Sequence, residues 1–276
     1  MHRSASFFPA SVLGVCLLAT LIPAAAGAQA PAANGTPRHE AEQNLVNLPT
    51  VSPLHRFGHH FRITHRFARD LRRGDLGQLA SDLFGLDNGA VIGLDYRFAP
   101  MTDVQVGVYR SMLLRTIQVS GRVDAWKEGE GLPLALSFLA SVEGVNNMRD
   151  DHAPAVGLVA SRTFGGIVAG YVTPVFVWNS AAASLFDDGE ENTAFVGLGT
   201  RVKVRPTAFV VVEYSPRVAG HSPPGRGTWG VAVEKHTPGH IFQLNLTNSF
   251  GTTYGQTALG GESGNIYLGF NIARKW

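Results

Sequence analysis

Apolar and polar residues alternate with a period of two along most of the chain after residue 57. Residues 89–98 read GAVIGLDYRF and residues 265–272 read NIYLGFNI, each with an apolar side chain at every second position. Successive side chains of a β-strand point to opposite faces of a sheet, so this alternation predicts strands with one apolar and one polar face. The pattern predicts about twelve strands, within a range of ten to fourteen, at 57–67, 89–98, 103–111, 116–125, 133–143, 154–163, 166–178, 193–204, 207–215, 228–236, 240–249 and 265–275.

The connections between these strands sort by length. Those after odd-numbered strands are mostly long, at 68–88, 112–115, 144–153, 179–192, 216–227 and 250–264. Those after even-numbered strands are mostly short, at 99–102, 126–132, 164–165, 205–206 and 237–239. The connection 112–115 is short for its class and 126–132 is long. Outer-membrane barrels have long outer loops and tight periplasmic turns, whereas a soluble β-sandwich has no reason to sort its loops in this way.

Composition narrows the class of protein further. The chain is 45% hydrophobic and only 16% charged, which argues against a disordered protein. Its net charge of +2 gives no strongly basic surface of the kind that binds nucleic acid. After residue 30 there is no run of 18 apolar residues, and the most apolar segment, 165–178, is interrupted by Pro174. Because a membrane excludes unpaired strand edges, the sheet must close. We therefore predict an all-β, transmembrane antiparallel β-barrel of about twelve strands over residues 54–276. A soluble lipocalin-like barrel is the rival fold, and it would have about eight strands and an apolar interior.

The N-terminal segments are predicted to lie outside the barrel. Residues 1–30 have a basic start, an apolar stretch and a final Ala28-Gln29-Ala30, which is typical of a cleaved signal peptide; a single anchoring helix is the alternative. The only cysteine, Cys16, lies within this segment, so the exported chain is expected to form no disulfide. Residues 31–53 are predicted to be a polar periplasmic leader that is extended or loosely packed.

The chain ends on an aromatic residue, with apolar residues alternating back from it. This ending resembles the insertion signal of bacterial outer-membrane barrels, although Arg274 stands where an apolar residue is usual. We expect the protein in the outer membrane of a Gram-negative-type bacterium, in contact with its lipid and lipopolysaccharide and with the barrel-assembly machinery. The predicted signal consists of Ile266, Leu268, Phe270, Ile272 and Trp276.

Four stretches together resemble an uncharacterised bacterial β-barrel family, a domain of unknown function found in exported proteins. They are Phe61-Arg62-Ile63-Thr64-His65-Arg66-Phe67, Asp82-Leu83-Phe84-Gly85-Leu86-Asp87, Ala90–Phe98 and Val106-Gly107-Val108-Tyr109-Arg110-Ser111. The resemblance covers about residues 45–276. It implies a barrel and carries over no activity or catalytic residue.

Residues 75–86, DLGQLASDLFGL, depart from the strand pattern. Asp75 can cap a short helix on which Leu76, Leu79 and Leu83 share one face. This helix lies in the first outer loop. It is predicted either to enter the barrel mouth as a constriction or to pack on the barrel rim.

Three clusters could carry chemistry, and none has a convincing motif. Residues 55–65 contain four of the ten histidines, but strand alternation divides them between two faces, which disfavours a metal site. The acidic loop 187–191 could bind calcium or contact lipopolysaccharide through divalent cations, although its spacing is not that of an EF-hand. The serine in 220–224 lacks the second glycine of a G-x-S-x-G elbow. We predict no catalytic residue, metal or cofactor, and an outer-membrane lipid hydrolase is the less favoured alternative.

The polar face of the strands carries six basic and five acidic side chains, which we predict to line the lumen. Twelve strands lie between small barrels filled by side chains and large open porins. The charges could pair across the bore and partly close it, or form a narrow channel that weakly favours anions. The first functional prediction is thus passive passage of an unidentified small solute, and the alternative is an occluded structural or binding barrel. The predicted lumen residues are Arg62, Arg66, Asp95, Arg97, Arg122, Asp124, Glu143, Arg201, Lys203, Glu213 and Glu234.

Overall fold

The computed structural model describes residues 42–180, 192–220 and 226–276, which belong to one compact unit. The predicted signal peptide, the first part of the predicted leader and the acidic loop 187–191 lie outside the described residues, as does most of the serine motif at 220–224. No helix within the described ranges is long and apolar enough to cross a membrane.

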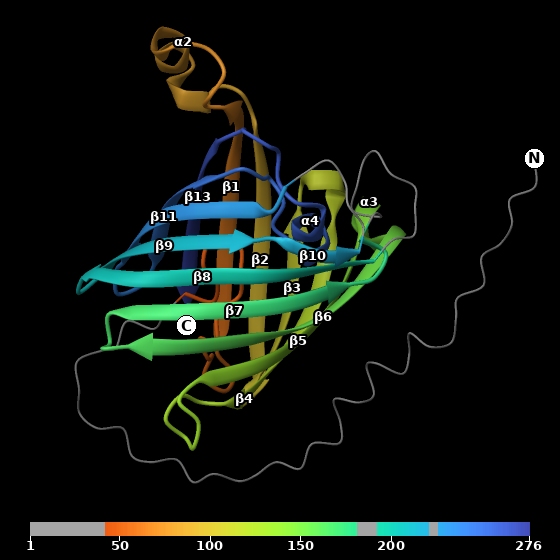
Figure 1. Ribbon diagram of the computed structural model, residues 1–276, viewed down its shortest axis with the longest axis vertical. Helices are drawn as coiled ribbons and strands as arrows, with labels where there is room; N and C mark the ends of the chain where they lie inside the picture. Colours follow the sequence, from red (N-terminus) through yellow and green to blue (C-terminus); the bar gives the residue numbers. More distant parts are fainter. Residues whose placement is uncertain (1–41, 181–191, 221–225) are drawn as a thin grey trace, which may run out of the picture. The chain divides into compact units, whose positions relative to one another are not determined.

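The described residues form one antiparallel sheet that closes on itself (Figure 1). Neighbouring strands in the chain pair with each other around the sheet, β13 pairs with β1, and β8 pairs with β9. The strands are β1 (His59–Asp70), β2 (Ala90–Met101), β3 (Val104–Ser111), β4 (Ile117–Trp126), β5 (Ala135–Gly144), β6 (Asp150–Phe164), β7 (Val168–Val177), β8 (Thr193–Arg205), β9 (Ala208–Ser215), β10 (Arg217–Gly220), β11 (Thr228–His236), β12 (Ile241–Thr247) and β13 (Tyr267–Lys275).

Twelve strands make the barrel, as the alternation predicts. The short β10 continues β9 after Pro216 and pairs with β8, the same neighbour as β9, so the two segments count as one strand. Proline lacks a backbone N–H and interrupts the ladder at this point. A closed sheet leaves no unpaired edge, which is the condition for a barrel in a membrane.

The seam of the barrel joins its first and last strands. His60 of β1 lies opposite Lys275 of β13. The N–H of His59 donates to the carbonyl of Trp276 at 2.8 Å, and the N–H of Trp276 donates back at 3.1 Å. The chain therefore enters and leaves the sheet at the same end, which we call the turn end because it carries the β2–β3 and β8–β9 turns.

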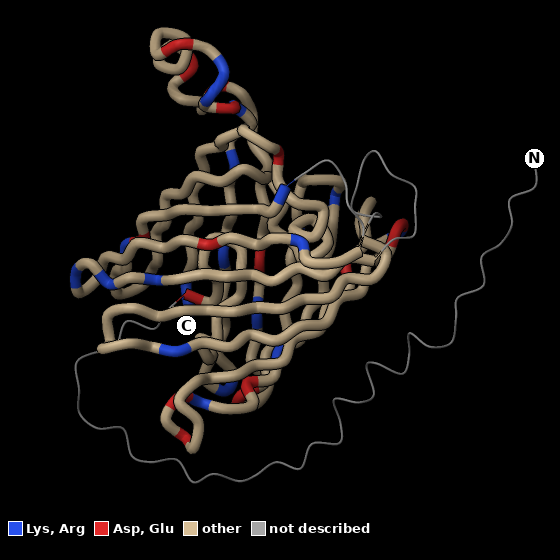
Figure 2. The backbone as a smooth tube through the Cα atoms, in the orientation of Figure 1, with Lys and Arg blue, Asp and Glu red and all other residues tan. Residues whose placement is uncertain are grey.

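The opposite end, the loop end, carries the longer connections and the helices. They include α2 (Leu76–Ser81), α3 (Val145–Met148) and α4 (Tyr254–Leu259), with one-turn segments at Leu83–Gly85 and Leu113–Arg115. The predicted short helix is present as α2, and Asp75 caps it in a capping box with Gln78. It projects beyond β1 and β2 (Figure 1), and Figure 2 shows charged residues of both signs along this projection.

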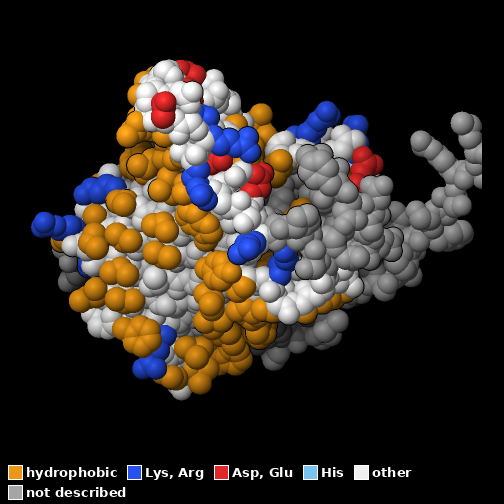
Figure 3. Space-filling model, turned by 45° about the horizontal axis from the view of Figure 1, so that its top comes forward, with side chains coloured by type: hydrophobic (Ala, Val, Ile, Leu, Met, Phe, Trp, Pro, Cys, Tyr) orange, Lys and Arg blue, Asp and Glu red, His pale blue; other side chains and the backbone are white. Residues whose placement is uncertain are grey.

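The two faces of the wall are inverted relative to a soluble protein. On β2, Leu94 and Tyr96 are 45% and 42% exposed on the outer face, whereas Asp95 between them is 5% exposed and faces the lumen. Figure 3 shows apolar side chains spread over the outer wall of the barrel. This arrangement excludes the rival soluble barrel, whose apolar residues would point inward.

Candidate functional site: the filled lumen

The lumen contains a hairpin formed by the residues just before the first strand. We call residues 42–54 the lumen hairpin. Its arms are joined by a hydrogen bond from the N–H of Thr50 to the carbonyl of Gln43 at 2.9 Å, and its tip by one from Leu45 to Leu48 at 2.7 Å. At the tip, Leu45, Val46 and Leu48 are buried, and Asn47 is partly exposed. The prediction of an extended or loosely packed leader over residues 31–53 is therefore wrong for residues 42–53.

The reason is the chemistry of the hairpin and of the wall that it meets. Residues 43–54 carry no charge, so little is lost when they leave water. Leu45, Val46 and Leu48 pack in one cluster of buried residues with the inward side chains Val175, Val177, Phe195, Val211 and Ala232.

Glycines on the wall make room for this tip. A Cβ at Gly197 would lie 2.5 Å from Cδ2 of Leu48, and one at Gly230 would lie 3.0 Å from Cβ of Val46. A Cβ at Gly199 would collide with the side chain of Leu45. Three lumen positions thus lack a side chain where the hairpin fills the space.

The carboxylate of Glu213, on β9, holds the tip of the hairpin. It accepts hydrogen bonds from the backbone N–H groups of Val46 at 2.9 Å, Asn47 at 2.9 Å and Leu48 at 3.1 Å. Consecutive backbone N–H groups that converge on one carboxylate are a common anion-binding arrangement. The tip therefore satisfies a buried charge that has no ion-pair partner among the described residues.

Five arginines of the wall donate to oxygen atoms of the hairpin. Arg62 donates to the carbonyl of Val46 at 2.7 Å, and Arg201 donates to that of Asn44 at 2.8 Å. The side-chain oxygens of the two asparagines are also used: Arg97 donates to Asn44 at 2.6 Å and Arg66 to Asn47 at 3.0 Å. The fifth, Arg122, donates to the carbonyls of Thr50 and Ser52.

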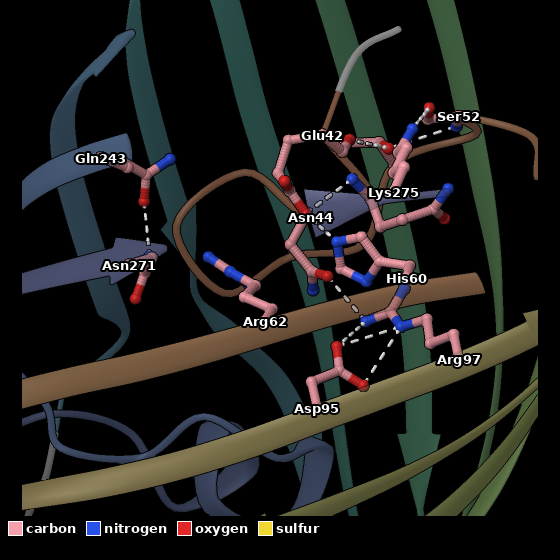
Figure 4. Close-up of polar contacts among 12 residues, drawn as sticks. Glu42, Asn44, Ser52, His60, Arg62, Asp95, Arg97, Gln243, Asn271 and Lys275 are labelled. Atoms are coloured by element: carbon pink, nitrogen blue, oxygen red, sulfur yellow. Dashed lines mark hydrogen bonds and ion pairs between the residues drawn. The ribbon is translucent and has the colours of Figure 1, made fainter. Parts of the chain in front are cut away.

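The base of the hairpin is fixed at the turn end (Figure 4). The carboxylate of Glu42 lies 2.7 Å from Nε2 of His60, and Lys275 donates to the hydroxyl of Ser52 at 2.8 Å. Burial by itself would raise the pKa of Glu42. The opposing effects of His60, Arg62 and Lys275 outweigh burial and hold the pKa of this carboxyl well below its ordinary value. Glu42 is therefore ionised throughout the neutral range.

The β12–β13 loop fills the lumen from the loop end. Its helix α4 has four buried residues and is capped by Thr253, in a capping box with Gln256. Glu143 of β5 accepts hydrogen bonds from the hydroxyl of Thr253 at 2.8 Å and from the N–H of Gly255 at 2.9 Å. Gln118 of β4 donates to the same carboxylate at 3.0 Å. The two segments that enter the barrel are thus each held by one buried glutamate.

A cavity of about 50 Å³ remains between the hairpin, the β1–β4 wall and the β12–β13 loop. Its walls include Asn44 and Asn47 of the hairpin and three of the arginines, Arg62, Arg97 and Arg122. A space of this size holds a few water molecules and no organic solute. Among the described residues, the hairpin and the β12–β13 loop thus fill most of the lumen.

The structure places the predicted lumen charges as follows. Ten of the eleven side chains lie in the lumen, where that of Arg97 is 16% exposed, that of Asp124 is 7% exposed and the other eight are buried. The eleventh, Lys203, is exposed near the turn end of β8. Three arginine–carboxylate pairs form, Arg97–Asp95 at 2.8 Å, Arg122–Asp124 at 2.9 Å and Arg201–Glu234 at 3.2 Å. The predicted lumen residues leave out the uncharged polar side chains of the same face, such as those of Gln243 and Asn271, where the amide of Asn271 donates to the side-chain oxygen of Gln243 at 2.6 Å (Figure 4).

The other predicted positions lie on or near the outer face. Leu268, Phe270 and Ile272 of the predicted insertion signal are partly exposed on β13, Ile266 directly precedes that strand, and Trp276 stacks on His59 with ring centroids 5.6 Å apart. His59 and His65 point outward while His60 points inward. Within the described residues, no group of three or more His, Cys, Asp and Glu side chains is arranged to hold a metal.

A family model described as a membrane bound beta barrel domain (DUF5777) matches residues 41–276. No curated protein matches the chain. Among solved structures, the Acinetobacter baumannii outer membrane protein Omp33 is 11% identical over 80% of this chain and 98% of its own, with a TM-score of 0.48. The NanC porin is 6% identical over 78% of this chain and 98% of its own, with a TM-score of 0.48. An outer membrane channel from Pseudomonas putida F1 is 11% identical over 88% of this chain and 99% of its own, with a TM-score of 0.44.

The family match begins at the base of the lumen hairpin and runs through the last strand, so it includes both the wall and the segment that fills it. These residues, 41–276, are most of the 276-residue chain. The chain belongs to this family of membrane-bound β-barrel domains of unknown function.

Proposed function

We propose that the protein is an outer-membrane barrel that passes small solutes and is closed by its own lumen hairpin. The observation that carries this proposal is the position of residues 42–54, most of which are buried inside a twelve-strand wall that would otherwise enclose a polar bore. Passage requires the hairpin to leave the lumen. The conformation with the hairpin inside the lumen is the shut state of this proposal.

The contacts of the hairpin support a removable segment. Apart from the apolar tip, they are hydrogen bonds to charged side chains and to the amides of Gln105, Gln243 and Asn271, and water or a polar solute can replace such partners. A purely structural filling could be made of apolar side chains at lower cost, because buried charges must be desolvated. The hairpin also contributes no strand to the barrel, so its departure leaves every ladder between strands intact.

The direction of departure follows from the positions of the two ends of the hairpin. Glu42 contacts the first residues of β1, and residues 55–58 connect Leu54 to the same strand, so both ends lie at the turn end. The β12–β13 loop occupies the loop end. Withdrawal through the turn end is therefore the open route. Because short turns face the periplasm in outer-membrane barrels, the hairpin would withdraw toward the periplasm.

Conductance across a planar bilayer tests the proposal. The full chain should be nearly silent, and a variant without residues 42–53 should conduct. A variant without residues 31–41 keeps the predicted cleavage site and the hairpin and loses nearly the same length of chain, so it should stay silent. Heat-modifiable migration of each detergent-extracted protein checks that the barrel has folded.

The second candidate function is a permanently occluded structural or binding barrel. The hydrogen bonds between Glu143 and the start of α4 favour this second function, because they keep the β12–β13 loop inside the loop end independently of the hairpin. A folded barrel that stays silent without residues 42–53, and also when residues 253–260 are removed in addition, would establish this second function and refute passage.

A further inference from the structure

The hairpin covers a basic surface of the lumen. Each of the five arginines that contact it donates to an oxygen: backbone carbonyls for Arg62, Arg122 and Arg201, and amide oxygens for Arg66 and Arg97. The hairpin thus offers these cations a row of oxygen acceptors. When it departs, all five lose at least one hydrogen bond.

The charge around the hairpin is positive without it. The ten buried lumen charges predicted from the sequence comprise five arginines and five carboxylates. One of those carboxylates, Glu143, contacts α4 in the β12–β13 loop and makes no hydrogen bond to the hairpin, which leaves five arginines against four carboxylates around the hairpin. Lys275 adds a positive charge at the turn end. The hairpin itself contributes a single charge, that of Glu42.

Two of the arginines have no carboxylate partner. Arg97, Arg122 and Arg201 each form an ion pair with a neighbouring carboxylate, whereas Arg62 and Arg66 have none within 4.0 Å among the described residues. Both lie on the inward face of β1, and both are at most 3% exposed. The Nε atom of each is buried without a hydrogen-bond partner in the described part of the chain. Two desolvated guanidinium groups with unused donors are a strong site for an oxyanion.

We propose that the solute of this barrel is a small organic carboxylate, bound by Arg62 and Arg66 on the surface that the hairpin covers. A guanidinium presents parallel N–H groups that match the two oxygens of a carboxylate. Arg97 and Arg122 line the adjoining cavity and extend the basic surface beyond the β1 pair. The carbonyl and amide oxygens of the hairpin stand in for the carboxylate oxygens of the solute in the closed state.

A consequence is competition between hairpin and solute, and this part rests on the proposed function. The cavity of about 50 Å³ is too small for an organic solute while the hairpin is present. A carboxylate that binds only the open state shifts the population toward that state. Binding of the solute would therefore favour the conformation in which the hairpin has left the lumen.

Binding to the hairpin-deleted barrel tests the site without any current. With succinate as the probe, titration calorimetry on the variant without residues 42–53 should show binding, and succinamide, its uncharged analogue, should not bind. Changing Arg62→Gln in that variant should weaken succinate binding about tenfold or more, because a charge-assisted hydrogen bond is lost. Arg274→Gln removes the same charge from the exposed outer face of β13 and should leave binding unchanged.

Selectivity gives the second readout. In a KCl gradient the hairpin-deleted barrel should prefer chloride, and Arg62→Gln should lower that preference by up to about fivefold, the effect of one unit charge about 4 Å from an ion in water. Absence of succinate binding, or equal weakening by Arg62→Gln and Arg274→Gln, would overturn the carboxylate site. A barrel that binds succinate and never conducts would keep the site and refute passage.

Discussion

Glu213→Gln should release the lumen hairpin. In the closed barrel this carboxylate accepts from three consecutive backbone N–H groups at 2.9 to 3.1 Å. A glutamine side chain keeps the size of the glutamate, but one of its two oxygen acceptors becomes an NH₂ group that faces those donors. At least one buried N–H then lacks an acceptor, and the remaining bonds lose their ionic character.

The magnitude follows from these contacts. A buried N–H without a partner costs about 1–3 kcal/mol, and replacing a charged acceptor by a neutral one costs about 1 kcal/mol more. A total of about 3 kcal/mol shifts the ratio of open to closed hairpin by about 150-fold. The wall itself should stay intact, because the strand ladders of β9 use only backbone groups.

Hydrogen exchange of the backbone amides, followed by mass spectrometry on peptides that cover residues 42–54, measures this shift directly. Exchange in these peptides should accelerate about 150-fold, while peptides from β1 to β13 keep their protection. Glu143→Gln is the matched control: it removes another buried lumen carboxylate, and it should accelerate exchange in residues 253–260 and leave the hairpin protected. Hairpin exchange that is unchanged in a folded Glu213→Gln barrel would refute the role assigned to this glutamate.

Three further outcomes are expected. In the Glu213→Gln background, where the hairpin is released, a disulfide between Val46→Cys and Gly230→Cys should silence the current until a reductant is added. Their Cβ atoms would lie 3.0 Å apart, about 0.5 Å less than the usual minimum for a disulfide, so the tip must shift slightly to form it. A current that ignores the reductant would contradict closure by the hairpin. Leu244→Arg, at an outer position 58% exposed in the middle of β12, should destabilise the barrel in a bilayer by about 2–4 kcal/mol in urea unfolding, and a cost near zero would argue against a lipid-facing wall. Glu42→Gln should weaken the protection of the hairpin amides at neutral pH. Because the pKa of Glu42 is lowered in the folded barrel, the stability that this carboxylate contributes is fully present above the ordinary value of 4.5 and is lost as the pH falls through the lowered value. An exchange difference between the two proteins that vanished between pH 7 and pH 5 would rule out the Glu42–His60 ion pair.

The barrel wall could be predicted from the sequence because its pattern is local. Along β2 or β13, successive side chains point alternately to the lipid and to the lumen, so about ten residues suffice to identify the strand and its two faces. The same alternation places the charges of the wall, such as Arg62 and Asp95, on the inner side. The prediction ends β1 at 67 and begins β6 at 154, whereas these strands run to Asp70 and from Asp150. It also places Arg217–Gly220 in a loop, whereas these residues form β10 after the interruption at Pro216.

The contents of the lumen could not be predicted in the same way. Some partners of the hairpin, such as His60 and Arg62, lie only 18 and 16 residues from their contacts in it, but others, including the glutamate that holds its tip, lie far along the chain. Glu213 is 165 to 167 residues away, and Arg201 is 157 residues away. No pattern within residues 42–54 predicts that the segment is buried. Two signals were nevertheless present in the sequence, namely the glycines at lumen-facing positions 197, 199 and 230, and the spacing of Thr253 and Gln256 that forms the capping box of α4.

The long separation between the hairpin and its partners also sets an order of events during assembly. The hairpin is the first described segment to be synthesised, but Glu213 and Gly230, which hold its tip, belong to β9 and β11 and come near the end of the chain. Closing a loop of some 165 residues costs about 4–5 kcal/mol of chain entropy beyond the constant for loop initiation. The hairpin can therefore bind inside the lumen only after the late strands have folded. The time at which its amides become protected from exchange would thus mark the time at which the barrel is complete.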